Sequence, residues 1–431
     1  MVSAIVLGNA AIIVWLWLRG GGISAVHGTG EAFTSVGRIT GLLGAYLLLI
    51  QILMLARLPF AEQLSGFDKI TIWHRRNGKL CLYLILAHVV FITIGYAGMD
   101  KITVPREVST LLTNYPGMVT ATVGTVLLIL VVATSLIIVR QRLRYEAWYL
   151  VHLLSYAGIV FAWFHEIPTG NEFALNATAA GYWTALYVGT LALMVLFRVI
   201  RPLQRGSWYH LRVSEVIQEG PNVVSLRMRG RHLDKLDIQA GQFFLWRFLD
   251  RGRWWESHPF SLSAAPDGRS LRITVKNIGD FTSHMSSIRP GTHVVAEGPF
   301  GHFTDAARRK EKVALIAGGI GITPIRALAE EMIGDVVLIY RVLREEDIVF
   351  RAELDHIAQV RGITVHYVVG HHAAPQGEWI MSPEHLHELM PDIEEREIYV
   401  CGPPRMADFI KLNVRNAGVP SKYIHIDRFA L

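Results

Sequence analysis

The sequence predicts a membrane-embedded α-helical bundle of six spans, followed by a β-barrel domain and a doubly wound α/β domain. The chain has 431 residues, of which 51% are hydrophobic, and most of the apolar residues lie in the first half. After residue 205, short segments bounded by turn residues replace the long apolar ones. From residue 312, strand-like and helix-like segments alternate, which is typical of a parallel sheet. The expected domains are therefore residues 1–205, 206–308 and 309–431.

Six segments are long and apolar enough to cross a bilayer, which takes about 20 mostly apolar residues. They cover residues 2–18, 39–56, 72–98, 117–139, 147–167 and 180–199. The first segment is short, but it lacks the basic start of a secretory signal peptide, so we interpret it as a span. These segments predict an integral membrane protein.

The distribution of positive charge predicts the orientation of the bundle. With a cytoplasmic N-terminus, the inner connections carry Arg57, Lys69, Arg75, Arg76, Lys79, Arg140, Arg142, Arg144, Arg198, Arg201 and Arg205. The outer connections carry only Arg19, Arg38, Lys101 and Arg106. This asymmetry follows the positive-inside rule and places both termini in the cytoplasm. It also accounts for the net charge of +6, so the charge gives no reason to expect nucleic acid as a partner.

Four histidines lie in the apolar segments as two pairs, His74 with His88 and His152 with His165. Ionisable side chains are costly in hydrocarbon, so each of them suggests a function. Spacings of 14 and 13 residues separate the members of each pair by about 20 Å along a helix. Two such helices side by side would hold two levels of paired imidazoles. Because imidazole is an axial ligand of haem iron, the pattern predicts two stacked bis-histidine haems.

The helical periodicity fits the first pair better than the second. At about 100° per residue, His88 lies within roughly 40° of His74, but His165 lies about 220° from His152. A π-bulge, an unwound end or a twist in the second helix would be needed to direct both rings at one partner. Hydrogen-bonded packing and a proton relay are the alternatives for membrane histidines.

The second half of the chain reads first as an antiparallel barrel and then as alternating strands and helices. The barrel strands are expected at residues 208–217, 222–229, 242–249, 271–277 and 293–297, a spacing typical of all-β domains. The parallel part is expected to have strands at 313–317, 336–340, 364–369 and 398–401 and helices at 324–332 and 349–359. Cys81 falls in a span and Cys401 in the cytosolic half, so no disulfide is expected.

A glycine-rich turn follows the first strand of the parallel part, with the sequence Ala317-Gly318-Gly319-Ile320-Gly321-Ile322-Thr323-Pro324. Glycines allow a pyrophosphate to approach the backbone, and the next helix offers its positive N-terminus. This is not the GxGxxG fingerprint, and such a turn alone is a weak signal.

Further motifs follow one another in a fixed order along the cytosolic half. They are His258-Pro259-Phe260-Ser261, Lys276-Asn277-Ile278-Gly279-Asp280-Phe281-Thr282, Gly298-Pro299-Phe300-Gly301 and Cys401-Gly402-Pro403-Pro404. In this order they resemble flavin reductases of the ferredoxin-reductase type. Joined to a helical bundle with paired histidines, they resemble a compact, prokaryotic-type member of the NADPH oxidase and ferric reductase superfamily. The resemblance covers nearly the whole chain.

The resemblance implies FAD, two b-type haems and NAD(P)H as cofactors and electron donor. It implies that His258, Pro259, Phe260 and Ser261 form the flavin strand, with Phe260 beside the isoalloxazine and Ser261 near its reactive nitrogen. It also implies that two side chains hold the FAD diphosphate, Lys276 and Thr282. Lys276 replaces an arginine that is usual in the family, which keeps the charge but loses the bidentate geometry.

The nicotinamide side follows from the same resemblance. Gly318, Gly319, Gly321, Ile322 and Thr323 are expected to hold the dinucleotide pyrophosphate, and Cys401, Gly402 and Pro403 to lie beside the nicotinamide. Arg341 is expected to bind the adenosine 2′-phosphate, with Arg344 assisting unless its acidic neighbours occupy it. Relatives often end in an aromatic residue that covers the flavin, and here Phe429 is the candidate. Cys401 and Phe429 are thus the expected catalytic positions.

The outer face of the bundle departs from the pattern of the animal oxidases. Those carry a second outer histidine at the position of Ile92, while Arg38 remains available for a haem propionate. We expect electrons to pass from cytosolic NAD(P)H through FAD and both haems to an outer acceptor, with O2 giving superoxide favoured over a ferric chelate. A transporter or proton channel with a flavin-binding domain is the alternative of another class. A plasma-membrane location is expected, and no obligate protein partner.

Overall fold

The computed structural model describes residues 2–58, 67–136, 139, 142–143, 145–170, 176–250, 254–370 and 379–429. The chain divides into two compact units, Met1–Ile200 and Arg201–Leu431. Arg140 and Arg144, which contribute to the charge asymmetry, and the two residues after Phe429 lie outside the described part.

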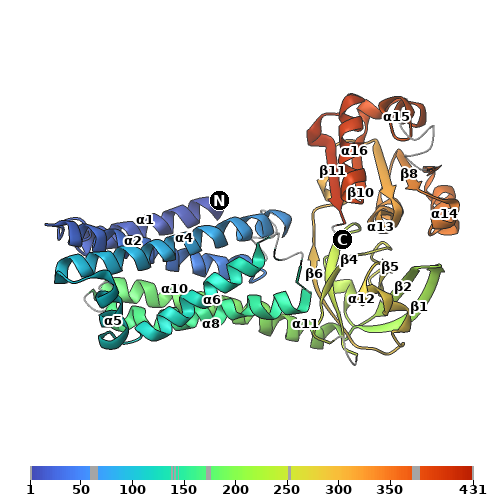
Figure 1. Ribbon diagram of the computed structural model, residues 1–431. Helices are drawn as coiled ribbons and strands as arrows, with labels where there is room; N and C mark the ends of the chain where they lie inside the picture. The colour runs from blue at the N-terminus through green and yellow to red at the C-terminus, as the bar shows by residue number, and fades with distance from the viewer. Residues whose placement is uncertain are drawn as a thin grey trace. The chain divides into compact units, whose positions relative to one another are not determined.

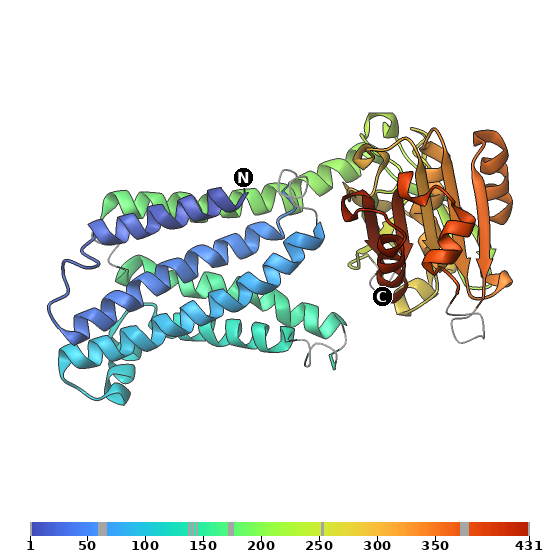
Figure 2. The same ribbon diagram turned by 90° about the horizontal axis from the view of Figure 1, so that it is seen from above.

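The first unit is a bundle of helices that run alongside one another (Figures 1 and 2). Its helices are α1 (Val2–Arg19), α2 (Thr29–Met54), α4 (Phe67–Asp100), α5 (Val104–Asn114), α6 (Met118–Ser135), α8 (Tyr145–Thr169) and α10 (Ala177–Val195). Predominantly apolar sequence without interior breaks makes the long helices, and the short α5 is amphipathic and follows α4. These long apolar helices make the chain an integral membrane protein.

Five helices in the described residues are long and apolar enough to cross a membrane. They are Thr29–Met54, Lys69–Asp100, Met118–Ser135, Ala147–Thr169 and Ala177–Tyr209. The apolar helix Ser3–Arg19 is shorter than these, so the sixth predicted span is not confirmed. The span predicted at residues 39–56 begins earlier, at Thr29, because a polar first section with Glu31 and Arg38 is helical although it is not strongly apolar.

The last helix of the bundle is also longer than predicted. A π-helical turn at Leu196–Ile200 joins α10 to α11 (Arg201–Tyr209), and the helix therefore continues past residue 199. The first barrel strand, predicted from residue 208, consequently begins only at Arg212.

Glycines bring neighbouring helices of the bundle into close contact. A Cβ on Gly37 of α2 would lie 2.8 Å from Ile92 Cγ1 of α4, and a Cβ on Gly124 of α6 would lie 2.6 Å from Gly158 O of α8. Small residues at helix interfaces are the usual route to tight packing in lipid, where no hydrophobic effect drives the helices together. The helix pairs α2–α4 and α6–α8 are therefore fixed at short separation.

The second unit begins with two three-stranded antiparallel sheets. One has the order β1-β2-β5 and the other β4-β3-β6. The strands are β1 (Arg212–Gly220), β2 (Val223–Arg229), β3 (Phe243–Phe248), β4 (His258–Ser261), β5 (Ser270–Lys276) and β6 (Val294–Phe300). A core that includes Leu226, Trp246 and Ile273 fills the space between the sheets. This is the predicted barrel, with β4 as an additional strand.

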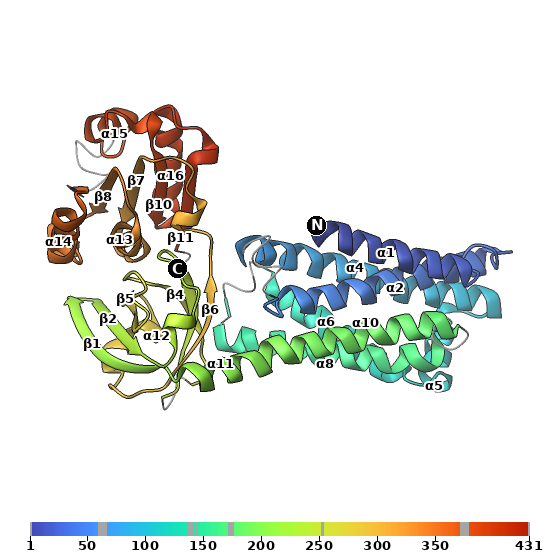
Figure 3. The ribbon, with the colours of Figure 1, turned by 180° about the vertical axis from the view of Figure 1, so that it is seen from behind.

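A five-stranded parallel sheet with the order β11-β10-β7-β8-β9 follows, with helices on both of its faces (Figure 3). Its strands are β7 (Val313–Gly318), β8 (Val336–Val342), β9 (Thr364–Val369), β10 (Glu397–Gly402) and β11 (Ile424–Arg428), and its helices are α13 (Ile322–Glu331), α14 (Arg351–Arg361), α15 (Pro383–Leu389) and α16 (Pro404–Asn416). The strand order reverses between β7 and β10. In open α/β sheets, ligands bind at the carboxyl ends of the strands at such a reversal.

Candidate functional site

The four membrane histidines form two facing pairs between α4 and α8. The ring centroids of His74 and His152 lie 6.1 Å apart with an interplanar angle of 52°. Those of His88 and His165 lie 6.3 Å apart with an angle of 41°. The structure thus brings together both pairs that the spacing predicts, at two levels of the bundle.

These separations suit a metal ion held between each pair. An imidazole nitrogen bonds a transition metal at about 2.0–2.1 Å, and the ring centre lies roughly 1 Å behind that nitrogen. Two imidazoles on opposite sides of one metal ion therefore have centroids about 6 Å apart. The donor set fits two bis-histidine haems, because imidazole is an established axial ligand.

Backbone carbonyls fix the ring orientation of the pair His88 and His165. The Nδ1 of His88 lies 2.8 Å from Gly37 O, and the Nδ1 of His165 contacts Ala162 O. A carbonyl can only accept, so each Nδ1 carries the proton and each Nε2 presents its lone pair. A Cβ on Gly41 would lie 2.5 Å from His88 Nδ1, so glycine at this position leaves room for the ring.

The pair His74 and His152 is oriented differently. Ser135 Oγ lies 3.2 Å from His152 Nδ1 and accepts a hydrogen bond of 3.2 Å from Trp148 Nε1, while its own hydroxyl donates to Val131 O at 2.6 Å. His152 Nδ1 is therefore the donor to Ser135. The Nδ1 of His74 is buried without a hydrogen-bond partner within the described part of the chain. Sequence reasoning missed Ser135 and Trp148, because neither belongs to the histidine pattern.

The spacing of His152 and His165 is accommodated within a regular helix. Helix α8 is α-helical from Tyr145 to Thr169, so neither a π-bulge nor an unwound end lies between the two rings. Of the three expected adjustments, only a twist of the helix remains. Close packing contributes on the α6 side, since a Cβ on Gly117 would lie 2.8 Å from His165 Cα.

Two further positions discussed above, Arg38 and Ile92, lie on α2 and α4. Arg38 lies on α2, and its guanidinium approaches Gly20 O at 3.5 Å. Ile92, which stands where the animal oxidases carry a second histidine, packs directly against Gly37. The close α2–α4 contact therefore fills that position with an apolar side chain.

The predicted flavin strand lies on β4 of the barrel. The His258 ring stacks on the Phe281 ring at a centroid distance of 3.7 Å, and the Phe260 ring lies 6.2 Å from the Phe281 ring. Trp246 Nε1 donates to Phe260 O at 2.9 Å and fixes the strand from behind. Pro259 is exposed, and Ser261 is buried at the end of the strand. Burial lowers the pKa of His258, against the neighbouring Glu256 carboxylate, and favours a neutral imidazole. Sequence reasoning did not single out Phe281, although it lies inside a quoted motif.

The two predicted diphosphate ligands lie at and just after the end of β5. Lys276 is the last residue of β5. Thr282 Oγ1 accepts hydrogen bonds from the backbone N–H groups of Ile278 (2.9 Å) and Gly279 (3.0 Å). Its hydroxyl therefore shapes the turn that carries the motif.

The glycine turn and the 401–403 loop meet at the reversal of the parallel sheet. A Cβ on Gly321 would lie 2.2 Å from Cys401 O, and a Cβ on Gly402 would lie 3.3 Å from Gly318 Cα. Gly319 has a φ of 53°, which favours glycine. Burial, with Asp427, raises the pKa of Cys401 well above its usual value, so its thiol stays protonated. Glycine at these positions lets the two loops approach each other.

The remaining members of the turn and the C-terminal aromatic residue belong to the same region. Ile322 and Thr323 are buried at the start of α13. Phe429 packs on the core that contains Cys401, and its backbone N–H donates to Gly402 O at 3.3 Å. The structure therefore places Phe429 beside the loop that ends in Pro403.

The two arginines predicted to read the 2′-phosphate differ in their surroundings. Arg341 lies on β8 in register with Gly318 of β7, with only 4% of its surface exposed. Burial lowers its pKa, and binding of an anion would offset that cost. The Arg344 side chain is 70% exposed and pairs with Glu346 at 2.5 Å and Asp347 at 3.5 Å. Its own acidic neighbours thus occupy Arg344.

Family models match three successive parts of the chain. The model described as ferric reductase like transmembrane component matches residues 40–163, the FAD-binding domain matches residues 208–304, and the oxidoreductase NAD-binding domain matches residues 315–412. The chain belongs to the NADPH oxidase and ferric reductase superfamily. As a superfamily member, it is a ferric reductase-like transmembrane flavocytochrome oxidoreductase that takes electrons from NAD(P)H.

Individual relatives are similar to parts of the chain. The chain is 25% identical over 299 residues to a probable ferric reductase transmembrane component of Candida albicans, covering 66% of this chain and 41% of that protein. It is 31% identical to NADH-cytochrome b5 reductase 1 of Meyerozyma guilliermondii, over 35% of this chain and 57% of the relative. The FAD/NAD-binding domain of a Vibrio cholerae nitric oxide dioxygenase is similar over 51% of this chain and 98% of its own, at 23% identity and a TM-score of 0.43.

A buried charge network joins the FAD and NAD parts of this superfamily member. Arg272 of β5 binds Glu353 of α14 through two hydrogen bonds of 2.9 Å, and Arg326 of α13 binds the same carboxylate at 2.7 Å. Both arginines also donate to Ser263 O. Burial alone would raise the pKa of Glu353, but the guanidinium groups of Arg272 and Arg326 outweigh it and lower the pKa. Sequence reasoning missed this network, which holds the flavin strand against the nucleotide sheet.

Proposed function

We propose that the chain is a transmembrane oxidoreductase that moves electrons from cytosolic NAD(P)H through FAD and two bis-histidine haems to an acceptor on the outer face. The acceptor that we favour is O2, which would be released as superoxide. One NAD(P)H then reduces two O2 molecules by one electron each, and one proton is released in the cytosol. The observation that carries the proposal is the presence of two histidine pairs, 6.1 and 6.3 Å between centroids, in a chain that also has FAD-binding and NAD-binding domains.

In the proposed topology, Ser3–Arg19 is a sixth span, and both termini are cytoplasmic. The excess of Lys and Arg in the inner connections supports this orientation. His74 and His152 would then hold the inner b-type haem, and His88 and His165 the outer one. Electron movement outward from a negative interior is favourable by about 2.3 kcal/mol per charge per 100 mV. We propose that the protein resides in the plasma membrane.

Each residue has a positioning role in this proposal. The Gly37 and Ala162 carbonyls hold the outer imidazoles with Nε2 toward the metal position, and Ser135 does so for His152. Arg38 lies at the outer end, where it can neutralise a propionate. When bound, FAD and the haems supply the redox chemistry, which protein side chains cannot provide.

On the cytosolic side, the donor and flavin sites would meet near the sheet reversal in this proposal. His258 to Ser261 and Phe281 would hold the flavin ring, with Lys276 and the Thr282 turn at its diphosphate. The 318–323 turn would hold the dinucleotide pyrophosphate, with Arg341 at a 2′-phosphate. Cys401 and Phe429 would lie beside the facing nicotinamide and flavin rings, and the Cys401 thiol, which is buried in the core, would bring no charge to the site. Exclusion of water there would protect a transferred hydride.

A cofactor count tests the core of this proposal. Purified protein should contain two haems and one FAD per chain, and NAD(P)H should reduce both chromophores in a reduced-minus-oxidised spectrum. A chain that binds FAD but no haem when expressed with haem available would contradict the proposed electron path.

A ferric chelate is the second candidate acceptor. The similarity to a probable ferric reductase component of Candida albicans favours it, and the apolar Ile92 offers no polar group that could hold oxygen. The two acceptors separate when the protein is reduced anaerobically with NADPH and then given air or a ferric chelate. Rapid reoxidation by air with superoxide dismutase-sensitive cytochrome c reduction supports the oxidase. Slow reoxidation by air and fast reoxidation by iron would assign the protein as a ferric reductase.

A further inference from the structure

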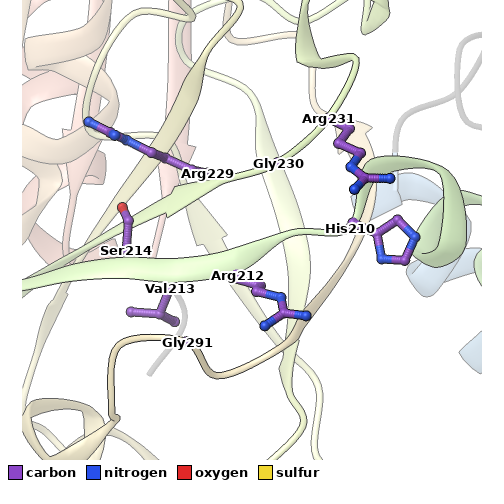
Figure 4. Close-up of a pocket in the computed structure, with 8 residues that line it drawn as sticks. All are labelled: His210, Arg212, Val213, Ser214, Arg229, Gly230, Arg231 and Gly291. Carbon is purple, nitrogen blue, oxygen red and sulfur yellow. The ribbon is translucent and has the colours of Figure 1, made fainter.

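A pocket of about 530 Å³ lies at the start of the barrel and is lined by His210, Arg212, Ser214, Arg229 and Arg231. In Figure 4 the side chains of His210, Arg212 and Arg231 gather at one end of the pocket, while Arg229 extends the other way. No carboxylate is among the lining residues. The pocket therefore concentrates positive charge on the surface of the second unit.

The arginines of this pocket lack a counter-charge among the residues that the structure describes. The described residues provide no ion pair and no side-chain hydrogen bond for Arg212, Arg229 or Arg231. Arg212 lies directly opposite Arg229 in the β1–β2 register, and their side chains extend in different directions (Figure 4). By contrast, Arg227 on the same strand is paired with Glu215 at 3.6 Å. The unpaired arrangement favours an external anion.

The pocket is separate from the proposed flavin site. On β2, Arg229 lies opposite Ser270 at one end of β5, whereas Val223 lies opposite Lys276 at the other end. Six residue steps along a strand amount to about 20 Å. The FAD diphosphate that is expected near Lys276 therefore does not account for the arginines.

The chain enters the pocket directly from the end of a candidate membrane span. The candidate span Ala177–Tyr209 has 33 residues and is about 50 Å long, whereas the hydrocarbon core is about 30 Å thick and the whole bilayer about 40–45 Å. Its last turns therefore reach the headgroup layer, and His210 follows directly. Leu203 and Trp208 in these turns are 68% and 54% exposed, beside Arg201 and Arg205. Exposed Trp and basic residues are typical of the membrane interface.

We propose that this pocket binds the phosphodiester headgroup of an anionic phospholipid through Arg212 and Arg231. The third basic residue of the pocket is His210, which lies in the chain between the last helix and the first barrel strand. The guanidinium groups supply charge-assisted hydrogen bonds to phosphate oxygens. Binding would anchor the first barrel strand to the membrane surface. The inference depends on membrane insertion and is independent of which acceptor the protein reduces.

The test uses the full-length protein in a non-ionic detergent. Binding of dioctanoyl phosphatidylglycerol, of dioctanoyl phosphatidylcholine and of inorganic phosphate is measured by native mass spectrometry and calorimetry. We expect phosphatidylglycerol to bind at least tenfold more tightly than phosphatidylcholine, and more weakly as salt increases. Equal affinity for the two lipids would overturn the proposal. Inorganic phosphate that displaces phosphatidylglycerol at equal concentration would assign the pocket to a free anion and overturn the lipid assignment.

Variants identify the residues. Each arginine should contribute about fivefold, so the R212Q/R231Q double variant should bind phosphatidylglycerol roughly 25-fold more weakly. R227Q, which lies on β2 and whose arginine is paired with Glu215, is the matched control and should bind as wild type does. Full phosphatidylglycerol affinity in the double variant would overturn the proposal. Flavin and haem absorbance report whether each variant folds. If the double variant does not fold, the single variants R231Q and R231K provide the same comparison. R231Q should bind phosphatidylglycerol about fivefold more weakly, and R231K, which keeps the charge, should bind nearly as wild type does.

Discussion

In the membrane unit the candidate ligands are long side chains on regular helices, whereas in the second unit the candidate site is mostly backbone at the ends of strands. His88 and His165 reach one position from α4 and α8, and carbonyls of Gly37 and Ala162 set their rings. The nucleotide turn instead depends on missing side chains, since a Cβ on Gly321 would lie 2.2 Å from Cys401 O. A metal needs a few directed donors, while a dinucleotide needs a close-fitting backbone surface.

This difference implies that the two units can be damaged separately. The histidine pairs involve only residues of Met1–Ile200, and the flavin and nucleotide sites involve only residues of Arg201–Leu431. A lesion in one unit should leave the cofactors of the other in place. Electron transfer from NAD(P)H to a soluble dye and electron delivery across the membrane should therefore respond differently to each change.

Removal of an outer ligand should produce the largest effect. His165→Leu is expected to abolish the outer haem and electron delivery across the membrane, because leucine offers no donor atom. Flavin content and NAD(P)H-dependent dye reduction should stay at wild-type levels. Haem per chain is measured by the pyridine haemochrome spectrum, with His27→Leu, outside the pairs, as the control. Two haems per chain in the His165→Leu variant would refute the ligand assignment.

The corresponding substitution in the second unit is Gly321→Ala. The new Cβ would overlap the Cys401 backbone, so the glycine turn must move away from the 401–403 loop. A displacement of about 1 Å at a reacting centre can cost roughly a hundredfold, and we expect a fall of that order in kcat/KM for NAD(P)H with two haems retained. Gly220→Ala, where nothing lies within 4 Å of the new Cβ, is the control. Wild-type kinetics in Gly321→Ala would mean that the turn does not bind the dinucleotide.

A smaller and more selective effect is expected at the 2′-phosphate. Arg341→Ser should raise the KM for NADPH about tenfold or more, because a hydrogen bond to a charged group contributes about 1.5–3 kcal/mol. The KM for NADH should change little. Arg344→Ser tests the neighbour that is occupied by Glu346 and should have a weak effect on either cofactor. Equal increases for NADPH and NADH in Arg341→Ser would show that Arg341 does not read this phosphate.

Sequence patterns predicted the elements of both units better than their ends. The apolar segments and the order of motifs indicated the bundle, the barrel and the parallel sheet, because hydrophobic periodicity and turn residues are local signals. The continuation of the last helix to Tyr209 was missed, since its final turns are polar and amphipathic. The polar first section of the helix that begins at Thr29 was missed for the same reason.

The candidate site was predictable where a residue type carries its own chemistry. Histidine spacing indicated His74, His88, His152 and His165, although the 13-residue spacing could not reveal how one regular helix directs both rings. Side-chain rotamers and helix crossing decide that geometry. Partners from distant segments, such as Glu353 with Arg272, have no local signal in a single sequence. Ser135 is of this kind, 17 residues from the ring that it contacts.

Ser135 provides the smallest test of how far the two units, and the two levels of the bundle, are independent. Ser135→Ala removes the acceptor of the His152 Nδ1 proton, whereas the outer imidazoles keep their backbone carbonyls. A weakened hydrogen bond makes the imidazole a poorer electron donor, so the inner haem should become easier to reduce. A net contribution of about 0.5–1.5 kcal/mol corresponds to a rise of roughly 20–60 mV. Redox titration of the full chain should resolve this shift in one haem, with the outer potential, the flavin content and dye reduction unchanged. Ser109→Ala, on the exposed face of α5, is the matched control. Equal shifts in the potentials of both haems would mean that Ser135 acts through the bundle as a whole. An unchanged potential would mean that Ser135 does not tune His152 through this hydrogen bond.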